Sequence, residues 1–143
     1  MIFCDTSTAV KLYVPEAEST AVRGQLEAED EVFVSELARV ELMGAFHRRL
    51  REGIWTREDL TAAVRQFTRD EISCFLTWLP MDNAIIDAAA KTYTSLSEKV
   101  YLRSADCLHL VTALHYNFGE IDTHNKHQAA AAVALGLKPV AIS

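Results

Sequence analysis

Residues 101–128, YLRSADCLHLVTALHYNFGEIDTHNKHQ, contain the pattern that decides the fold. Asp106 opens an apolar run at residues 107–114, which is followed by a short strand pattern and a polar turn. The apolar run has to be buried, so we expect the Asp106 carboxylate to lie at the edge of a core. It needs a partner there, because an unpaired buried charge is very costly. Asp5 and Glu41 occupy similar settings, and we expect the three carboxylates to converge on a divalent metal ion.

Strand and helix patterns alternate along the rest of the chain. We expect strands at residues 1–4, 31–35, 74–79, 118–121 and 139–142. We expect helices at residues 7–13, 16–28, 36–51, 57–72, 83–93, 105–114 and 126–135. This alternation predicts an α/β protein with a parallel sheet covered by helices on both faces, joined by right-handed crossovers. The length of 143 residues suits one domain spanning residues 1–143.

Helix ends and faces are also predicted from local patterns. Thr56 and Asp59 have the spacing of a capping box, and Ser104 is the expected cap of the helix that carries Asp106. Glu41 lies in the middle of the apolar stripe that we expect on the 36–51 helix, which consists of Leu37, Val40, Gly44 and Ala45.

The composition limits the partners and the compartment. The net charge is −6, so the chain as a whole is not attracted to nucleic acid, and such binding needs a local basic patch. Three cysteines without a CxxC spacing indicate a reducing compartment rather than a disulfide framework. The opening MIFCDTST lacks the basic region of a signal peptide, and no apolar run approaches membrane-spanning length. We therefore expect a cytoplasmic protein with no membrane association.

Each of the three carboxylates also has a simpler explanation. Asp5 follows the first strand, at the sheet edge where ligands bind in open α/β sheets, but it could equally cap the next helix. Glu41 could reach solvent from the edge of its stripe. Their joint occurrence favours a metal site, because hard carboxylate oxygens suit Mg²⁺ or Mn²⁺. The five glycines form neither a P-loop nor a dinucleotide-binding motif.

Four segments, in this order and spacing, resemble the PIN-domain ribonucleases, and more closely the VapC-type toxins of bacterial and archaeal toxin–antitoxin pairs. They are MIFCDTSTAVKLYVPEAES (1–19), SELARVELMGAFHRRLREG (35–53), LRSADCLHLVTAL (102–114) and THNKHQAAAAVALGL (123–137). The resemblance covers essentially the whole chain. It implies a three-layer α/β/α sandwich with a central parallel sheet. It also implies metal-dependent endoribonuclease cleavage of structured RNA such as tRNA or rRNA, by in-line attack of water that leaves a 5′-phosphate and a 3′-hydroxyl.

The resemblance also assigns site residues. It implies that the family's acidic positions fall on Asp5, Glu41 and Asp106, which would bind Mg²⁺ (or Mn²⁺). Thr123 matches the hydroxyl residue before the family's last acidic position, which is Asn125 in this chain. Asparagine keeps a carbonyl oxygen but loses the charge, so metal affinity should fall and a second metal site is doubtful.

Asn125 leaves three explanations open. The first is that Asn125 is natural and tolerated. The second is that it is an inactivating substitution, made so that a toxic protein can be expressed. The third is that Asp122, three residues earlier, compensates for the lost charge. The main alternative function is accordingly a disabled PIN-like protein that binds RNA or antitoxin without cutting. A phosphatase on a doubly wound sheet is a further alternative, but it usually needs a second aspartate two residues after the first, and Asp5 is followed by Thr6 and Ser7.

Partners and basic residues complete the expectations. The resemblance implies a homodimer and a VapB-type antitoxin that places a basic side chain near the acids. The candidates for RNA backbone contacts are Arg48, Arg49, Arg103 and Lys126. The arginines near the end of the 36–51 helix have a simpler explanation as well, because cations suit a helix C-terminus.

The histidines and cysteines receive structural interpretations. His124 and His127 are close in sequence, but no cysteine stands at a matching spacing for zinc. We interpret His109 as a hydrogen-bonded core residue and the other histidines as surface residues. Cys4 and Cys107 have no evident basic partner, so we expect buried small apolar residues rather than nucleophiles.

Overall fold

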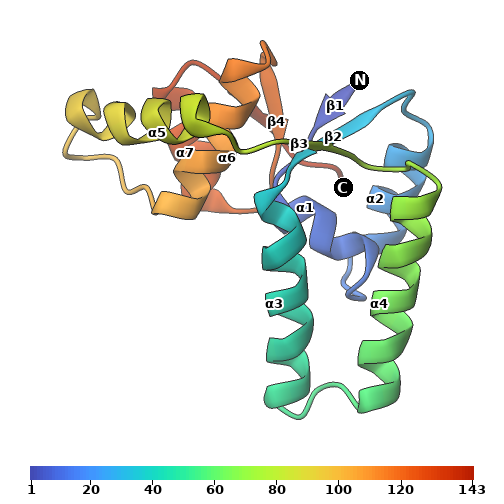
Figure 1. The fold of residues 1–143 in the computed structure, drawn as a ribbon. Helices are drawn as coiled ribbons and strands as arrows, with labels where there is room; N and C mark the ends of the chain where they lie inside the picture. The colour runs from blue at the N-terminus through green and yellow to red at the C-terminus, as the bar shows by residue number, and fades with distance from the viewer.

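The computed structural model describes all 143 residues, and Figure 1 shows their arrangement. The elements up to the first long helix are β1 (Ile2–Phe3), α1 (Thr6–Ala9), the 3-10 helix η1 (Val10–Leu12), α2 (Ser19–Glu27), β2 (Val32–Ser35) and α3 (Leu37–Arg51). They are followed by α4 (Arg57–Ile72), β3 (Thr77–Leu79), α5 (Asn83–Ser95), α6 (Ser104–His115), β4 (Glu120–Asp122), α7 (Lys126–Ala134) and β5 (Lys138–Val140).

The strands form a parallel sheet through the middle of the molecule. One group has the order β1-β2-β3, and β4 pairs with β5; all pairs are parallel. A parallel bridge between Cys4 and Asp122 joins the two groups. The Asp5 N–H donates to the Asp122 carbonyl at 3.1 Å and extends this pairing. The predicted central parallel sheet is therefore confirmed.

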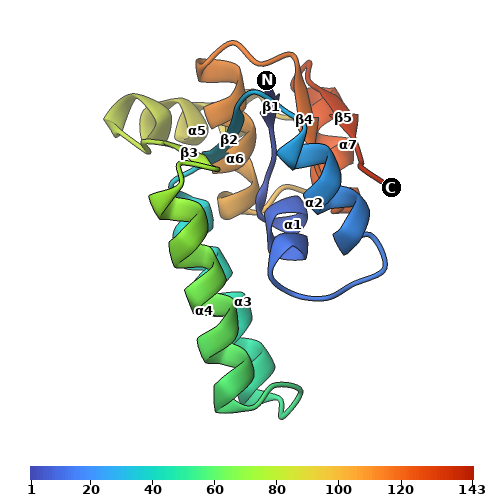
Figure 2. The ribbon, with the colours of Figure 1, turned by 90° about the vertical axis from the view of Figure 1, so that its right-hand side faces the viewer.

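Alternate residues of the central strands face two different cores. Cys4, Val32 and Val34 belong to the core that is shared with α2, α3 and α4. Phe3 belongs to the opposite core, which is shared with α6 and α7, and Phe33 packs against it. Helices thus cover both faces of the sheet (Figures 1 and 2), which confirms the three-layer α/β/α prediction. Burial on both faces explains why these strands read as continuous apolar runs.

Helices α3 and α4 form a pair that extends away from the sheet and is joined at its far end by a short loop (Figures 1 and 2). Tyr13 packs edge-on against Phe46 of α3 and Phe67 of α4, with ring centroids 5.8 Å apart in each pair. The predicted capping box is confirmed: the Asp59 N–H donates to Thr56 Oγ1 at 3.2 Å, and the Thr56 N–H donates to Asp59 Oδ2 at 2.8 Å. This box fixes the start of α4 after the turn.

The structure corrects the predicted apolar stripe of α3. The buried residues are Ala38, Leu42 and Phe46, at a regular spacing of four, whereas Val40 is 72% exposed. Because a turn takes 3.6 residues, choosing the wrong starting residue rotates the predicted face of the helix away from the real one. Glu41 consequently lies beside the buried stripe rather than in its middle.

Two predicted element boundaries are also wrong. Ser104 is already helical, and Arg103 occupies the cap position of α6 with no side-chain cap bond. Strand β3 begins at Thr77 rather than Cys74, because Cys74 has a left-handed φ of 57° that an extended strand cannot contain. None of the helices combines the length and the apolar character that crossing a lipid bilayer requires.

Candidate active site

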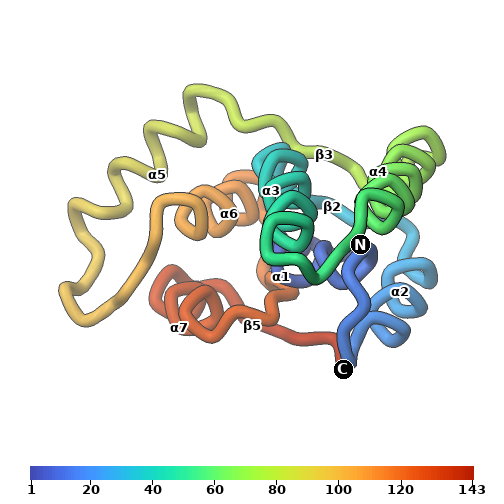
Figure 3. Tube along the Cα trace, turned by 90° about the horizontal axis from the view of Figure 1, so that it is seen from below, coloured from blue at the N-terminus to red at the C-terminus, as the bar shows by residue number.

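The candidate site lies where parallel strands end. Asp5 follows β1, α3 with Glu41 follows β2, and α6 with Asp106 at its start leads into β4. Carboxyl ends of parallel strands share one edge of a sheet, which places Asp5 and Glu41 at that edge. The helix of Asp106 reaches the same place through His109, whose Nε2 lies 2.5 Å from Glu41 Oε1. In the view from below, α1 lies near the centre with α3 and α6 beside it (Figure 3).

Asp5 is buried, with 3% of the residue exposed, and its carboxylate is held by hydroxyl groups. Ser7 Oγ donates to Oδ1 at 2.6 Å, and Thr123 Oγ1 donates to Oδ2 at 2.6 Å. The Thr8 N–H also donates to Oδ1 at 3.3 Å, so Asp5 does cap α1, as its simpler explanation held. Burial raises the pKa of Asp5 above its ordinary value, although these hydrogen bonds oppose the rise. A nearby cation would stabilise the ionised form of this buried carboxylate.

Glu41 joins α3 to α1 and α6. Its Oε1 accepts a hydrogen bond of 2.7 Å from Thr6 Oγ1 and lies 2.5 Å from His109 Nε2. Burial acts to raise the pKa of Glu41, but the hydrogen bond and charge of His109 outweigh it and hold the pKa below its ordinary value. His109 is 1% exposed, which confirms its interpretation as a hydrogen-bonded core residue. Sequence reasoning did not identify Glu41 as its partner.

Asp106 lies in the first turn of α6, where the helix dipole favours a negative charge. It is 8% exposed, and its Oδ2 accepts a hydrogen bond of 3.0 Å from Arg103 Nε. The side-chain amide of Gln128, on α7, donates to the Asp106 carbonyl at 3.2 Å. This hydrogen bond, made by a fully buried side chain, connects α7 to the first turn of α6, which carries Asp106. No local pattern in the sequence predicts this contact.

Asn125 has a structural role in this chain. It is the cap of α7, and its Oδ1 accepts from the backbone N–H groups of His127 at 2.9 Å and Gln128 at 3.2 Å. The Asn125 N–H in turn donates to Thr123 Oγ1 at 3.2 Å. The turn thus links the start of α7 to the Asp5 carboxylate through the Thr123 hydroxyl.

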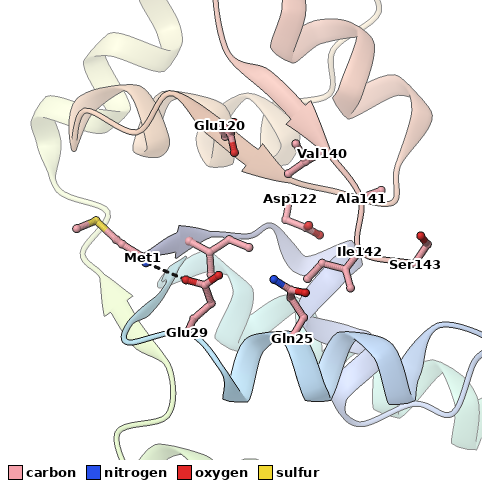
Figure 4. A pocket seen from close by; sticks show the side chains of 10 residues that line it. Met1, Gln25, Glu29, Glu120, Asp122, Val140, Ala141, Ile142 and Ser143 are labelled. Atoms are coloured by element: carbon pink, nitrogen blue, oxygen red, sulfur yellow. Dashed lines mark hydrogen bonds and ion pairs between the residues drawn. The ribbon is translucent and has the colours of Figure 1, made fainter.

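Asp122 is held by the side chains of Thr8 and His124. Its Oδ1 accepts a hydrogen bond of 2.6 Å from Thr8 Oγ1, which also lies 3.0 Å from His124 Nδ1. Asp122 lines a pocket of about 430 Å³ between the C-terminal segment and α2, whose lining includes none of the three acids Asp5, Glu41 and Asp106 (Figure 4). Thr8 connects Asp122 to Asp5, because its N–H donates to Asp5 Oδ1 at 3.3 Å while its hydroxyl donates to Asp122. Compensation for Asn125 by Asp122 stays a prediction.

His124 was expected at the surface, and this is wrong. Its side chain is 14% exposed, and its Nε2 lies 2.8 Å from the Ile142 carbonyl. The C-terminal segment after β5 covers it, a contact that no local pattern shows. Cys4 and Cys107 are buried as expected, and burial raises the pKa of both thiols.

Residues 2–134 match the sequence profile of the PIN domain. The chain belongs to the PIN-domain family. It is 31% identical over 144 residues to ribonuclease VapC46 of Mycobacterium tuberculosis (strain ATCC 25618 / H37Rv), covering 99% of this chain and 98% of that protein. The predicted relationship to VapC-type PIN proteins is thereby confirmed.

Solved structures support the same fold. The M. tuberculosis toxin VapC20, described as cleaving the sarcin-ricin loop, has a TM-score of 0.70 and 15% identity, with 92% of this chain and 95% of that chain covered. A chain of a toxin–antitoxin complex from Klebsiella pneumoniae has a TM-score of 0.63 and 18% identity, with 98% and 96% covered. At these identities the likeness concerns the fold alone.

The acids of this PIN domain fit a hard divalent cation by their chemistry. In the present conformation no three His, Cys, Asp or Glu side chains lie close enough together to hold one ion. Arg103 and His109 each engage one oxygen of an acid, whereas Asp106 Oδ1 and Glu41 Oε2 accept no hydrogen bond. Free carboxylate oxygens are suitable ligands for Mg²⁺ or Mn²⁺. Binding would require the acids to draw together and Arg103 to release Asp106, so the metal set remains a prediction.

The predicted RNA-contacting residues lie in different places on this PIN domain. Arg48 and Arg49 are in the last turn of α3, on the order of 10 Å along the helix axis from Glu41. Arg48 pairs with Glu52 at 2.9 Å, and Arg49 lies 3.7 Å from Glu16. Of the remaining two candidates, Arg103 pairs with Asp106, and Lys126 is exposed at the start of α7.

Proposed function

We propose that this chain is a divalent-metal-dependent endoribonuclease toxin of the VapC type, which cleaves structured RNA such as tRNA or rRNA. The observation that carries the proposal is the buried Asp5 carboxylate, held by Ser7 and Thr123 at the sheet edge that also presents Glu41 and Asp106. The similarity to a VapC ribonuclease along nearly the whole chain supports it.

The residues have distinct roles in this proposal. Asp5, Glu41 and Asp106 would hold Mg²⁺ or Mn²⁺. A cation held by carboxylates polarises a phosphoryl oxygen and lowers the pKa of a bound water. Thr123 orients Asp5, and Asn125 positions Thr123 through its backbone N–H. Arg48, Arg49, Arg103 and Lys126 would contact RNA phosphates, which supplies the local basic surface that a chain of net charge −6 needs.

Cleavage of a structured RNA with and without Mn²⁺ tests the proposal. We expect cleavage that depends on Mn²⁺ and leaves 5′-phosphates, with the product ends mapped. Asp5→Asn and Asp106→Asn, purified in the same way, are the controls for contaminating nuclease, and each should lower the rate by at least about 100-fold. Equal cleavage by the wild type and both variants would contradict the proposal.

Asn125→Asp distinguishes an active nuclease from a PIN protein that has lost its activity. Aspartate and asparagine cap helices about equally well, so this change alters charge at the site without removing the cap of α7. If both proteins cleave RNA, three carboxylates are sufficient. If only Asn125→Asp cleaves, the chain is a disabled PIN protein that binds RNA or antitoxin.

We further propose a VapB-type antitoxin and a homodimer as partners. The toxin–antitoxin complex from K. pneumoniae supports the antitoxin by its likeness of fold. Exposed apolar side chains on α3 and α5, namely Val40 (72%), Ile86 (43%) and Tyr93 (42%), offer surface that a partner could cover. Light scattering after size-exclusion chromatography tests the dimer, for which Val40→Glu should favour the monomer.

A further inference from the structure

His109 links the helix that carries Asp106 to the helix that carries Glu41. It stands three residues after Asp106 on α6, so both side chains leave the helix on the same face. His109 Nε2 reaches across to Glu41 Oε1 at 2.5 Å and lies 3.2 Å from Thr6 Oγ1. One helix therefore supplies an acid of the site and also the contact that holds a second acid.

The hydrogen bonds to Glu41 engage only one of its oxygens. An ionised carboxylate only accepts hydrogen bonds, so the hydrogen between the two groups lies on His109 Nε2 in the neutral and charged imidazole alike. The Thr6 hydroxyl donates to the same oxygen, Oε1, at 2.7 Å. Glu41 Oε1 is thus fixed by two donors, and Oε2 remains free for another ligand.

Packing alone does not explain a histidine at this position. The second ring nitrogen of His109, Nδ1, is buried and has no hydrogen-bond partner. A buried polar atom without a partner costs free energy, and an apolar side chain would fill the same space without that cost. The compensating interaction is the one that Nε2 makes with Glu41.

We propose that His109 is a positioning residue that holds Glu41 Oε1 and leaves Oε2 available to a divalent cation, which Glu41 would share with Asp5 and Asp106. This inference rests on the proposed metal-dependent function. Outer partners that fix a metal-binding side chain contribute about 10- to 100-fold to metal affinity. His109 therefore acts on metal binding through Glu41 and touches neither the metal nor the RNA.

Direct Mn²⁺ binding to the full chain, followed by the electron paramagnetic resonance signal of free Mn²⁺, tests this role. We expect His109→Leu to weaken binding by about tenfold or more, because it removes the donor. His109→Gln keeps an N–H donor and should stay within about threefold of the wild type. His115→Leu is the matched control, since His115 is an exposed histidine on the same helix, and it should leave binding unchanged.

A double-mutant cycle with Glu41→Gln distinguishes positioning from general loosening of the fold. Once the acid is replaced, His109→Leu should cause no further loss of Mn²⁺ affinity. His109→Phe, which keeps a ring but has no donor, serves the same purpose if the leucine variant does not fold. The proposal is overturned if His109→Leu lowers Mn²⁺ affinity equally in the wild type and in Glu41→Gln. It is also overturned if His109→Gln binds Mn²⁺ as weakly as His109→Leu.

The two proposals fail in distinguishable ways. If the wild type binds Mn²⁺ and His109→Leu binds it equally well, the role of His109 is wrong and the proposed function stands. If the wild type binds no Mn²⁺, both the metal-dependent function and the role of His109 are wrong.

Discussion

Thr123 and Asp5 are 118 residues apart in the chain, and the Thr123 hydroxyl donates a 2.6 Å hydrogen bond to Asp5 Oδ2. The same hydroxyl accepts from the Asn125 N–H and lies 3.2 Å from Ser7 Oγ. The turn before α7 therefore completes the surroundings of an acid that the first strand delivers. Formation of the candidate site accordingly depends on the docking of the C-terminal part of the chain.

Thr123→Val should destabilise the protein by about 1.5–3 kcal/mol at pH 7, because the buried Asp5 carboxylate loses a donor while its charge remains. Urea denaturation measures the difference. Thr123→Ser keeps the hydroxyl and should lie much closer to the wild type. If the valine and serine variants are equally stable, the Thr123 hydroxyl does not support the Asp5 charge.

Asp5→Asn should stabilise the metal-free protein at pH 7, by on the order of 1 kcal/mol. Burial raises the pKa of folded Asp5 above 3.8, its ordinary value, so the folded chain binds this proton more tightly than the unfolded chain. The stability that this proton contributes is complete below pH 3.8 and is lost as the pH rises through the folded pKa. The advantage of asparagine should therefore shrink as the pH falls towards 3.8.

Urea denaturation between pH 3.5 and pH 8 tests the role of Asp5 in stability, with roughly unit steps in pH across the titration. Asp82→Asn is the matched control, because Asp82 caps α5 in the same way, accepting from the Ile85 N–H at 3.1 Å, but is exposed. Asp82→Asn should change the free energy of unfolding much less than Asp5→Asn does, because aspartate and asparagine are both good helix caps and the position is exposed. An Asp5→Asn variant that is less stable than the wild type at every pH would contradict the argument.

Local patterns were sufficient to predict the parts of the fold that depend on neighbouring residues. Asp5 at the end of β1 and the capping box at Thr56 were both placed correctly. A continuous apolar strand followed by polar residues, and a hydroxyl three residues before an acid, fix backbone geometry without distant contacts. The three-layer architecture was predicted correctly because strands and helices alternate along the chain.

Tertiary contacts decided what the sequence did not predict. The buried face of α3 depends on which side meets the sheet, so Val40 was wrongly placed inside. His124 is covered by the C-terminal segment, and His109 reaches Glu41 across 68 residues. Such pairings join side chains from separate elements, and no spacing along the chain encodes them.

Arg103→Gln should tighten Mn²⁺ binding by up to about fivefold in the absence of RNA, since a partly exposed ion pair is worth about 0.2–1 kcal/mol. Arg103 Nε donates to Asp106 Oδ2 at 3.0 Å and so competes with a cation for that oxygen. The Mn²⁺ concentration at which the melting temperature rises measures the change. Asp106→Asn should abolish the rise altogether.

Arg48→Gln is the matched control for Arg103. Arg48 Nε donates to Glu52 Oε1 at 2.9 Å, a similar ion pair in the last turn of α3 that involves none of the three acids. It should leave the Mn²⁺ response unchanged. If Arg103→Gln also leaves it unchanged, Arg103 does not compete with the cation, and its proposed role is limited to contacts with RNA.

Tyr13→Phe should destabilise the protein by about 1–3 kcal/mol while leaving Mn²⁺ binding intact. The Tyr13 hydroxyl donates a 2.7 Å hydrogen bond to Asp70 Oδ2, and both residues are buried. Burial, together with the hydrogen bond to Asp70, raises the pKa of Tyr13. Arg23 of α2 also contacts Asp70, at 3.2 Å, so this carboxylate ties η1, α2 and α4 together.

Tyr93→Phe is the comparison that isolates the effect of burial. Tyr93 is 42% exposed, and its hydroxyl donates to the Leu102 carbonyl at 2.8 Å, where water can replace it. Its loss should cost less than about 1 kcal/mol by urea denaturation. If the two substitutions lower the free energy of unfolding equally, the buried Asp70 carboxylate does not need the hydrogen bond from Tyr13. If Tyr13→Phe loses Mn²⁺ binding, the hydrogen bond between Tyr13 and Asp70 also affects the arrangement of Asp5, Glu41 and Asp106.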